Sequence, residues 1–402
     1  MFQTNLNERE SPIQAPMILA LLALMMIGAA FIYSATSNND MFRQLAWFRQ
    51  PAFKQIVFYF LGMWVGAGIC FVSYRRLARW SLVIYWFAIL LLAAVLFEKV
   101  GTKVFGARRW IDLGFFNLQP SEVAKLACIL AQGHFLSRPA EELRQPRIFF
   151  TALGLTLLPF VLILREPDLG SALVLLPITL VMMFAAGVPV SHLKRLVTGA
   201  GLLVLLILLD VLFAPVDFRI PLEDYQRDRL LVYFGRDFAP RSDTPAEHQR
   251  SDGLQQKKSY NVEQALISVG SGGLTGKGWR QGTQNALGYL PRAVAHNDFI
   301  FSVIAEEKGF LGSLIVLTLY GVVLFTGIHI AGQARDRLGR LLAIGVVTML
   351  FSHVFINIGM NIRLMPVTGI PLPLLSYGGT SVLCSLIAAG LLQNIHLHRD
   401  SY

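Results

Sequence analysis

Ten apolar stretches along the chain are long enough to be helices that cross a membrane. They lie near residues 17–36, 52–72, 78–98, 119–137, 147–164, 169–188, 193–213, 300–331, 340–361 and 376–396. A helix needs about 20 predominantly apolar residues to span the hydrocarbon core of a bilayer. The pattern therefore predicts an all-α polytopic membrane protein with about ten transmembrane helices.

The first stretch is too long and uninterrupted for a signal peptide, and no basic segment of the usual kind precedes it. If the amino terminus is cytoplasmic, the short inner segments carry more Lys and Arg than the short outer loops. This bias predicts that both termini are cytoplasmic. Four of the outer basic residues lie in one loop, 99–109, although basic residues normally favour the cytoplasmic side. This exception suggests that they have a specific role in that loop.

One long polar segment, 214–297, separates the seventh and eighth predicted helices. We expect a single membrane domain, 1–402, in which helices 1–7 occupy 1–213, this segment forms an extracytoplasmic loop, and helices 8–10 occupy 298–402. A loop of this length inside a compact bundle is usually functional. Its strongly polar middle, 240–259, is expected to be mobile.

Composition supports the membrane prediction and removes other classes. Of 402 residues, 54% are hydrophobic and only 15% charged, whereas soluble domains carry about a quarter charged residues. The net charge of +10 fits basic cytoplasmic loops and anionic lipid, so we expect a membrane and no nucleic acid as partner. The three cysteines lie in apolar segments, and neither they nor the scattered histidines have metal-ligand spacing.

The fourth predicted helix begins with Gln119, Pro120, Ser121 and Glu122 and continues to Lys125. Glu122 and Lys125 are three residues apart and so share a helix face. Ionisable groups at membrane depth often mark functional sites. Two interpretations remain open: a charged cavity, or a structural ion pair that locks two helices, with Gln119 or Ser121 as a helix cap.

Arg108 and Arg109 stand just before this helix, followed by Trp110. Two adjacent arginines at an interface could bind a diphosphate bidentately. Alternatively they extend to lipid headgroups while Trp110 lies in the aromatic belt. The less basic outer side favours the ligand role.

A glycine-rich segment, 270–278, contains Lys277 but fails the spacing of a phosphate-binding loop. Ser271 stands where the first glycine is required, and Gly278 replaces the Ser or Thr after the lysine. Its backbone amides could still bind a diphosphate. A plain hinge is equally compatible with the pattern.

His296, Asn297 and Asp298 stand where the long loop meets the eighth predicted helix. Asp298 could be a helix N-cap, a role that suits aspartate. It could equally be a carboxylate at the mouth of a membrane cavity that takes a proton from a sugar hydroxyl. Glu306, Glu307 and Lys308 follow within three turns, so this part of the helix should face protein or water.

Near the end of the chain, Arg363 leads through Pro366, Pro371 and Pro373 to Ser376 and a glycine pair. These residues predict broken backbone at membrane depth, which is tolerated only where it is buried in protein or lines a cavity. A kinked interfacial loop is the alternative. The sequence has no Asp-x-Asp pair of the kind that holds a metal against a nucleotide diphosphate, so a transferase would use a lipid-linked donor.

Seven motifs resemble those of the SEDS family (shape, elongation, division, sporulation). They lie at 109–114, 119–122, 167–170, 225–229, 270–279, 296–301 and 371–379. The first of these and Gly282-Thr283-Gln284 are more similar to the elongation branch of the family than to its division branch. Residues 259–261 and Ala265 depart from the usual pattern, which puts substrate contacts in the loop in question.

The resemblance implies a ten-helix, GT-C-like peptidoglycan glycosyltransferase in the bacterial cytoplasmic membrane. Such a protein polymerises lipid II, a disaccharide-peptide on undecaprenyl diphosphate, in complex with a class B penicillin-binding protein. By the same resemblance, Asp298 matches the family's essential aspartate, and Glu122 and Lys125 match its cavity ion pair. The motifs also supply the other candidate substrate-binding residues, Gln119, Ser121, Gln264, Ser271, His296 and Ser376.

The hypothesis is that the donor diphosphate lies against Arg109, Lys277 and Arg363 while Asp298 deprotonates the acceptor hydroxyl. A divalent cation, Mg²⁺ or Mn²⁺, is compatible with this chemistry, although the sequence shows no dedicated set of ligands. Three alternatives remain: a lipid II flippase, a scaffold for the penicillin-binding protein, and a division-specific polymerase.

Overall fold

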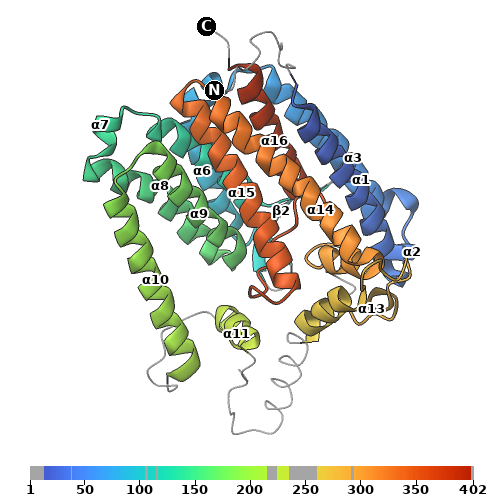
Figure 1. Cartoon of the computed structure of the whole chain (residues 1–402). Helices are drawn as coiled ribbons and strands as arrows, with labels where there is room; N and C mark the ends of the chain where they lie inside the picture. Colours follow the sequence, from blue (N-terminus) through green and yellow to red (C-terminus); the bar gives the residue numbers. More distant parts are fainter. Residues whose placement is uncertain are drawn as a thin grey trace, which may run out of the picture.

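The computed structural model describes residues 13–37, 39–104, 107–114, 116–214, 224–234, 260–290 and 294–399. The predicted mobile stretch, 240–259, lies outside these residues. Most of the long helices run side by side in one bundle (Figure 1). The observed architecture is therefore the helical membrane bundle that the apolar pattern predicts.

Each of the ten predicted spans corresponds to a helix. These are α1 (Ala15–Ser37), α3 (Pro51–Cys70), α5 (Ser81–Val95), α6 (Pro120–Leu136), α8 (Pro146–Arg165), α9 (Leu169–Ala186), α10 (Val190–Phe213), α14 (Ile300–Gln333), α15 (Arg337–Asn361) and α16 (Gly379–Leu397). In the described part of the chain, eight have the length and composition to cross a membrane. The other two, α5 and α6, have 15 and 17 residues, so the count of ten crossings stays a prediction.

Shorter helices connect the long ones. They are α2 (Asp40–Arg43), the 3-10 helix η1 (Trp47–Arg49), α4 (Tyr74–Arg79), α7 (Ala140–Leu143), α11 (Asp224–Tyr233) and α13 (Thr283–Ala286). Residues 260–271 are also helical. Helical structure is thus present in the described parts of the long polar segment, 224–234 and 260–290, whereas the assignment of the segment to the extracytoplasmic side remains a prediction.

A small antiparallel sheet precedes α6, and the all-α prediction missed it. Its strands are β1 (Gly101–Val104), β2 (Ala107–Asp112) and β3 (Asn117–Leu118), in the order β1-β2-β3. The strands are only two to six residues long, and three Lys or Arg residues in β1 and β2 mask the alternation that would have revealed the hairpin.

The centre of the bundle is formed by α15 and α16, which are buried over most of their length. Close approach of α16 to α3 depends on glycine: a Cβ on Gly390 would lie 2.5 Å from the carbonyl oxygen of Gly66. Small residues are typical of contacts between membrane helices because they let the backbones meet.

At the edge of the bundle, α10 stands apart from the other helices (Figure 1). Its middle residues, from Leu202 to Leu206, are all more than half exposed. An apolar surface of this kind is typical of a helix that faces lipid, which agrees with a multi-pass membrane protein.

The start of α1 and the end of α16 meet at the same end of the bundle. The backbone amide of Gln14 donates to Gln393 Oε1 at 3.2 Å, and the Gln14 side chain bonds His396. Both ends therefore lie on one side, and the assignment of that side to the cytoplasm stays a prediction.

Candidate functional site

Asp298 lies immediately before α14, half-buried. The cap position of this helix belongs to Phe299, which contributes no side-chain cap bond, so the interpretation of Asp298 as the N-cap is wrong. Two asparagines of α15 hold its backbone. Asn357 Nδ2 and Asn361 Nδ2 donate to the Asp298 carbonyl oxygen at 3.2 and 3.1 Å.

The Asp298 carboxylate faces the turn that follows α15. A Cβ built on Gly369 would lie 3.7 Å from Asp298 Oδ2, and Gly369 itself has a φ of 75°. Asn357 Nδ2 also donates to the Ile370 carbonyl at 2.7 Å. One amide group therefore fixes both the carboxylate-bearing residue and the turn beside it.

The proline-rich segment after this turn is buried in protein, which confirms that interpretation over a kinked interfacial loop. Ser376 is 1% exposed. Its Oγ donates to the Asn297 carbonyl at 2.6 Å, and the Tyr377 amide donates to the His296 carbonyl at 3.0 Å. The hydroxyl of Tyr59 satisfies a further carbonyl of the segment, that of Leu374. The irregular backbone is thus bonded within the protein, as the predicted position at membrane depth requires.

His296 is packed between two aromatic rings. Its ring centroid lies 5.3 Å from that of Phe42 and 5.5 Å from that of Tyr377. Burial disfavours the charged form and lowers the pKa of His296 to about 4. The imidazole is therefore neutral at pH 7 and does not offer a positive charge to a diphosphate.

Glu122 and Lys125 form a buried ion pair, with 2.7 Å between Lys125 Nζ and Glu122 Oε1. Lys125 Nζ also lies 2.7 Å from His353 Nε2, on α15. All three side chains are at most 3% exposed. A charge buried this deeply needs its partners in place. The ion pair itself lies within α6, and the contact of Lys125 with His353 is what links α6 to α15.

His353, Asn357 and Asn361 form a polar stripe along one face of α15. They are spaced four residues apart, which places them on one face of a helix, and all three are buried. The stripe connects the Glu122–Lys125 pair to Asp298. This stripe was not predicted from the sequence, although polar residues at this spacing in an apolar helix are a detectable signal.

Arg109 takes part in a second network, centred on Asp168. Its Nε donates to the Glu166 carbonyl at 3.1 Å, its Nη2 donates to the Pro167 carbonyl, and its Nη1 lies 3.9 Å from Asp168 Oδ1. Gln119 Nε2 donates to Asp168 Oδ2 at 3.0 Å.

Ser121 joins the same network, because its Oγ donates to Asp168 Oδ2 at 3.2 Å. Asp168 in turn caps α9 by accepting from the Ser171 amide. Gln119 and Ser121 therefore serve this network, and neither provides a side-chain cap for α6. Asp168 was not among the predicted site residues, although it stands in a quoted motif.

The two adjacent arginines do not act together. Neighbouring side chains in a strand point to opposite faces, and both arginines belong to β2. Arg108 pairs with Glu98, whereas Arg109 turns to the loop between α8 and α9. The prediction that both arginines clamp one diphosphate is wrong, because the region is a strand and not a loop.

The glycine-rich turn packs against α14 and stabilises a break in this helix. This helix is broken at Gly309, where φ is 64° and ψ is −159°. The amides of Lys277 and Gly278 donate to the carbonyls of Glu306 and Glu307, both at 3.0 Å. A Cβ on Gly276 would overlap the Glu307 carbonyl. The proposed use of these two amides for a diphosphate is therefore wrong.

Lys277 Nζ lies 2.7 Å from Glu306 Oε1, in an ion pair between the glycine-rich turn and α14. Glu306 and Glu307 are buried, as expected, whereas Lys308 is exposed. A role for Lys277 in binding a diphosphate would require that it leave Glu306.

The remaining candidates lie at the surface or near it. Ser271 is exposed and Gln264 half-exposed on the helix of residues 260–271, where Ser271 Oγ bonds the Ser268 carbonyl. Arg363 is half-exposed, has a φ of 59° and follows Asn361 by two residues. Among the residues that the structure describes, no group of three His, Cys, Asp or Glu side chains could hold a metal ion.

The fold and these motifs identify the class of protein. The model of the family described as cell cycle protein, which covers FtsW, RodA and SpoVE, matches residues 14–401. The chain belongs to this family.

Individual relatives are similar over most of the chain. The peptidoglycan glycosyltransferase MrdB of Escherichia coli K12 is 34% identical and covers 95% of this chain and 93% of its own. The stage V sporulation protein E of Bacillus subtilis is 35% identical, covering 94% and 95%. The peptidoglycan glycosyltransferase RodA of Treponema pallidum is 33% identical, covering 94% and 96%.

Two solved structures share the fold. One, described as the structural coordination of polymerization and crosslinking by a peptidoglycan synthase complex, has a TM-score of 0.74 at 29% identity and covers 97% of this chain and 99% of its own. The other, Thermus thermophilus rod shape determining protein RodA, has a TM-score of 0.65 at 29% identity, covering 96% and 98%.

Proposed function

We propose that this chain is a peptidoglycan glycosyltransferase that polymerises lipid II, with Asp298 as the base. The enzyme class is supported by relatives named peptidoglycan glycosyltransferase that are at least 33% identical over at least 94% of the chain. The single observation that carries the role of Asp298 is its geometry: a half-buried carboxylate, beside an irregular turn, on a backbone held by Asn357 and Asn361.

In this mechanism, Asp298 takes the proton of the acceptor's GlcNAc 4-hydroxyl. The freed oxygen attacks the anomeric carbon of the donor's MurNAc, and the bond from that carbon to the diphosphate breaks. Undecaprenyl diphosphate leaves with the electron pair. Attack opposite the leaving group inverts the configuration and gives a β-1,4 bond. One carboxylate suffices because the diphosphate needs no proton to depart.

Cations near the site would stabilise charge on the departing diphosphate. Arg363 is the best-placed candidate, because it is half-exposed and close in sequence to Asn361, which contacts Asp298. Arg109 and Lys277 would contribute only after exchange of their present bonds to the 166–168 loop and to Glu306. The Glu122–Lys125 pair orients α6 against α15 and exchanges no proton.

A class B penicillin-binding protein is the proposed partner. One similar structure belongs to a synthase complex that couples polymerization to crosslinking. The proposal places the chain in the elongation branch, in the bacterial cytoplasmic membrane, with both termini inside and the 214–297 segment outside.

The test is lipid II polymerisation by the purified full chain, alone and with the partner, for wild type and Asp298→Asn. Loss of a general base costs about 10²–10⁴-fold in rate. The matched control is Glu98→Gln, which removes one negative charge at an exposed side chain. We expect polymer from wild type and control and none from Asp298→Asn at equal thermal stability.

Other outcomes would point elsewhere. Normal polymer from Asp298→Asn would refute its role as the base. Absence of polymer from wild type with its partner, together with transport of lipid II between leaflets of a vesicle, would favour the flippase. The scaffold would be favoured by two results together. Asp298→Asn would leave function intact, and mutation of lipid-facing helix surfaces would abolish the activity of the partner.

A further inference from the structure

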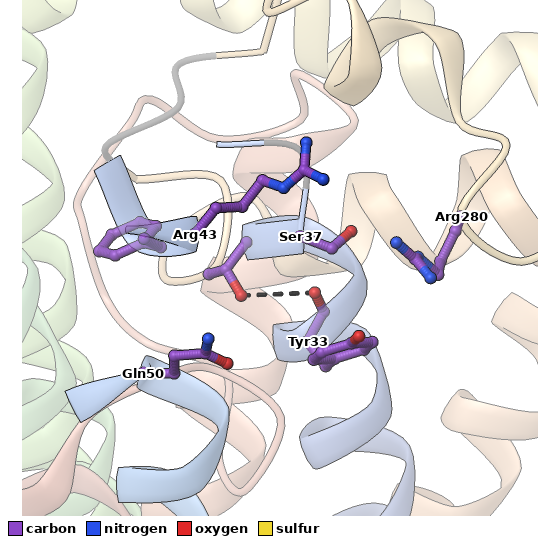
Figure 2. A pocket seen from close by; sticks show the side chains of 7 residues that line it. Tyr33, Ser37, Arg43, Gln50 and Arg280 are labelled. Carbon is purple, nitrogen blue, oxygen red and sulfur yellow. Dashed lines mark hydrogen bonds between the residues drawn. The ribbon is translucent and has the colours of Figure 1, made fainter. Parts of the chain in front are cut away.

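A polar pocket whose lining does not include Asp298 opens at the end of α1. It has a volume of about 240 Å³ and is lined by Tyr33, Thr36, Ser37, Phe42, Arg43, Gln50 and Arg280. These residues come from α1, from the connection to α3 and from the chain after the glycine-rich turn. Arg43 and Arg280 lie on either side of Ser37 (Figure 2). Among these lining residues there are two guanidinium groups and no carboxylate.

Capping of the carboxyl-terminal end of α1 does not explain why Arg43 and Arg280 lie at this pocket. Basic side chains often bond the last carbonyls of a helix. Here the carbonyls of Tyr33, Ser34 and Thr36 already accept hydrogen bonds from Thr36 Oγ1, Ser37 Oγ and the Asn39 backbone amide. These three carbonyls do not need Arg43 or Arg280 as caps.

Arg280 is held in place through its backbone. Its amide donates to Glu307 Oε2 at 2.9 Å, while Glu307 Oε1 accepts from Ser34 Oγ at 2.5 Å. The guanidinium carbon lies 5.5 Å from the ring centroid of Tyr33. A guanidinium over an aromatic face keeps its in-plane N–H donors for another partner. The side chain is thus oriented at the pocket with donors to offer.

The surroundings place the pocket at the depth of lipid headgroups. Large aromatic side chains are exposed around it, with Trp47 67% and Trp279 46% accessible. Aromatic belts of this kind mark the membrane–water interface. The pocket also meets the start of α3, where Gln50 is the cap residue without a side-chain cap bond. The amino-terminal end of a helix carries a positive partial charge.

We propose that this pocket binds the phosphate group of an anionic membrane lipid between Arg43 and Arg280. Guanidinium groups match phosphate oxygens bidentately, and the side-chain amide of Gln50 adds a neutral donor. At roughly 30 Å³ per water molecule in the liquid, the pocket has room for a phosphate group. The lining does not include Asp298, and the inference does not rest on the proposed reaction.

The experiment measures lipid binding to the purified, delipidated full chain by native mass spectrometry and by titration. The lipids are dioleoyl phosphatidylglycerol, dioleoyl phosphatidylcholine as the uncharged control, and undecaprenyl phosphate, each with and without inorganic phosphate as competitor. The variant is Arg43→Gln with Arg280→Gln. The matched control is Arg49→Gln with Lys54→Gln, which also removes two positive charges but at residues that do not line the pocket.

We expect wild type and the control pair to bind an anionic lipid, and the pocket pair to bind it about tenfold more weakly, since a hydrogen bond to a charged group contributes about 1.5–3 kcal/mol. Binding of phosphatidylglycerol identifies a headgroup as the source, and binding of undecaprenyl phosphate alone identifies a polyprenyl carrier. Displacement by inorganic phosphate shows that the phosphate group is what the pocket recognises.

Equal binding by the pocket pair and wild type, or an equal loss in the control pair, would overturn the proposal. If the glutamine pair does not fold, Arg43→Lys with Arg280→Lys is used, because lysine keeps the charge but not the bidentate fork. That pair should bind more weakly than wild type, and unchanged binding would likewise count against the site.

Discussion

Asn357 donates its side-chain amide to two backbone carbonyls, those of Asp298 at 3.2 Å and Ile370 at 2.7 Å. It thereby couples the start of α14 to the turn that faces the Asp298 carboxylate. An amide that holds two segments in this way acts on the reaction only through their positions.

Asn357→Ala should therefore slow polymerisation without removing a reacting group. A shift of about 1 Å in a catalytic residue can cost roughly 10²-fold in rate, so we expect a loss of about 10- to 100-fold. The measurement is the rate of polymer formation beside the melting temperature. Thr348→Ala removes a hydroxyl that bonds within α15 and should leave the rate unchanged. A similar rate in both variants would contradict the positioning role.

Lys125→Met should strongly destabilise the protein, because it leaves Glu122 buried without its cation. Removing one partner of a buried ion pair costs about 3–5 kcal/mol in free energy of unfolding. The double variant with Glu122→Gln should recover part of this loss. Arg138→Ala breaks an exposed pair with Glu142 and should cost under about 1 kcal/mol. Thermal unfolding in detergent measures all four proteins, and a fully stable Lys125→Met would contradict the interpretation.

The pKa of His296 predicts a loss of stability in acid. Its pKa is about 4 in the folded protein and 6.5 for the free side chain, so the unfolded chain binds more protons between these values. Above pH 6.5, protonation of His296 does not change the stability. As the pH drops from 6.5 toward 4, the free energy of unfolding falls by about 3 kcal/mol in total. His296→Gln should flatten this dependence, measured as melting temperature against pH. The same change at the exposed His134 should not, and an unaltered slope in His296→Gln would refute the prediction.

The pKa of Glu166 predicts the opposite dependence of stability on pH. Its side chain is fully buried, and its two carboxylate oxygens have no hydrogen-bond partner among the described residues. Burial, and then the nearby Asp168 charge, raise its pKa to about 9 from 4.5, against a smaller lowering by Arg109. The unfolded chain loses this proton first, so stability falls as the pH rises from 4.5 to about 9.

Glu166→Gln keeps the shape of the protonated carboxyl and has no proton to lose. It should raise the melting temperature at pH 8 and leave it nearly unchanged at pH 4. Glu142→Gln, at a side chain that is 45% exposed, should change neither value. A Glu166→Gln protein that is no more stable than wild type at pH 8 would show that the carboxyl is not buried in neutral form.

The apolar pattern determined the helices, because a bilayer demands about 20 apolar residues per crossing and few sequences meet that by chance. All ten predicted spans are helices. The same reasoning placed ionisable residues such as Glu122 and Lys125 inside the protein, since lipid cannot solvate them. It also identified the 371–378 segment as broken backbone buried in protein.

The roles of single polar groups were decided by the tertiary structure. From the sequence, the amides of Lys277 and Gly278 could bind a ligand. In the structure they donate to carbonyls of α14 beside the break at Gly309, about 30 residues further along the chain. Arg108 and Arg109 looked like a pair until a strand turned them to opposite faces. A sequence specifies which groups need partners, whereas only the packing of distant segments decides which partner each one finds.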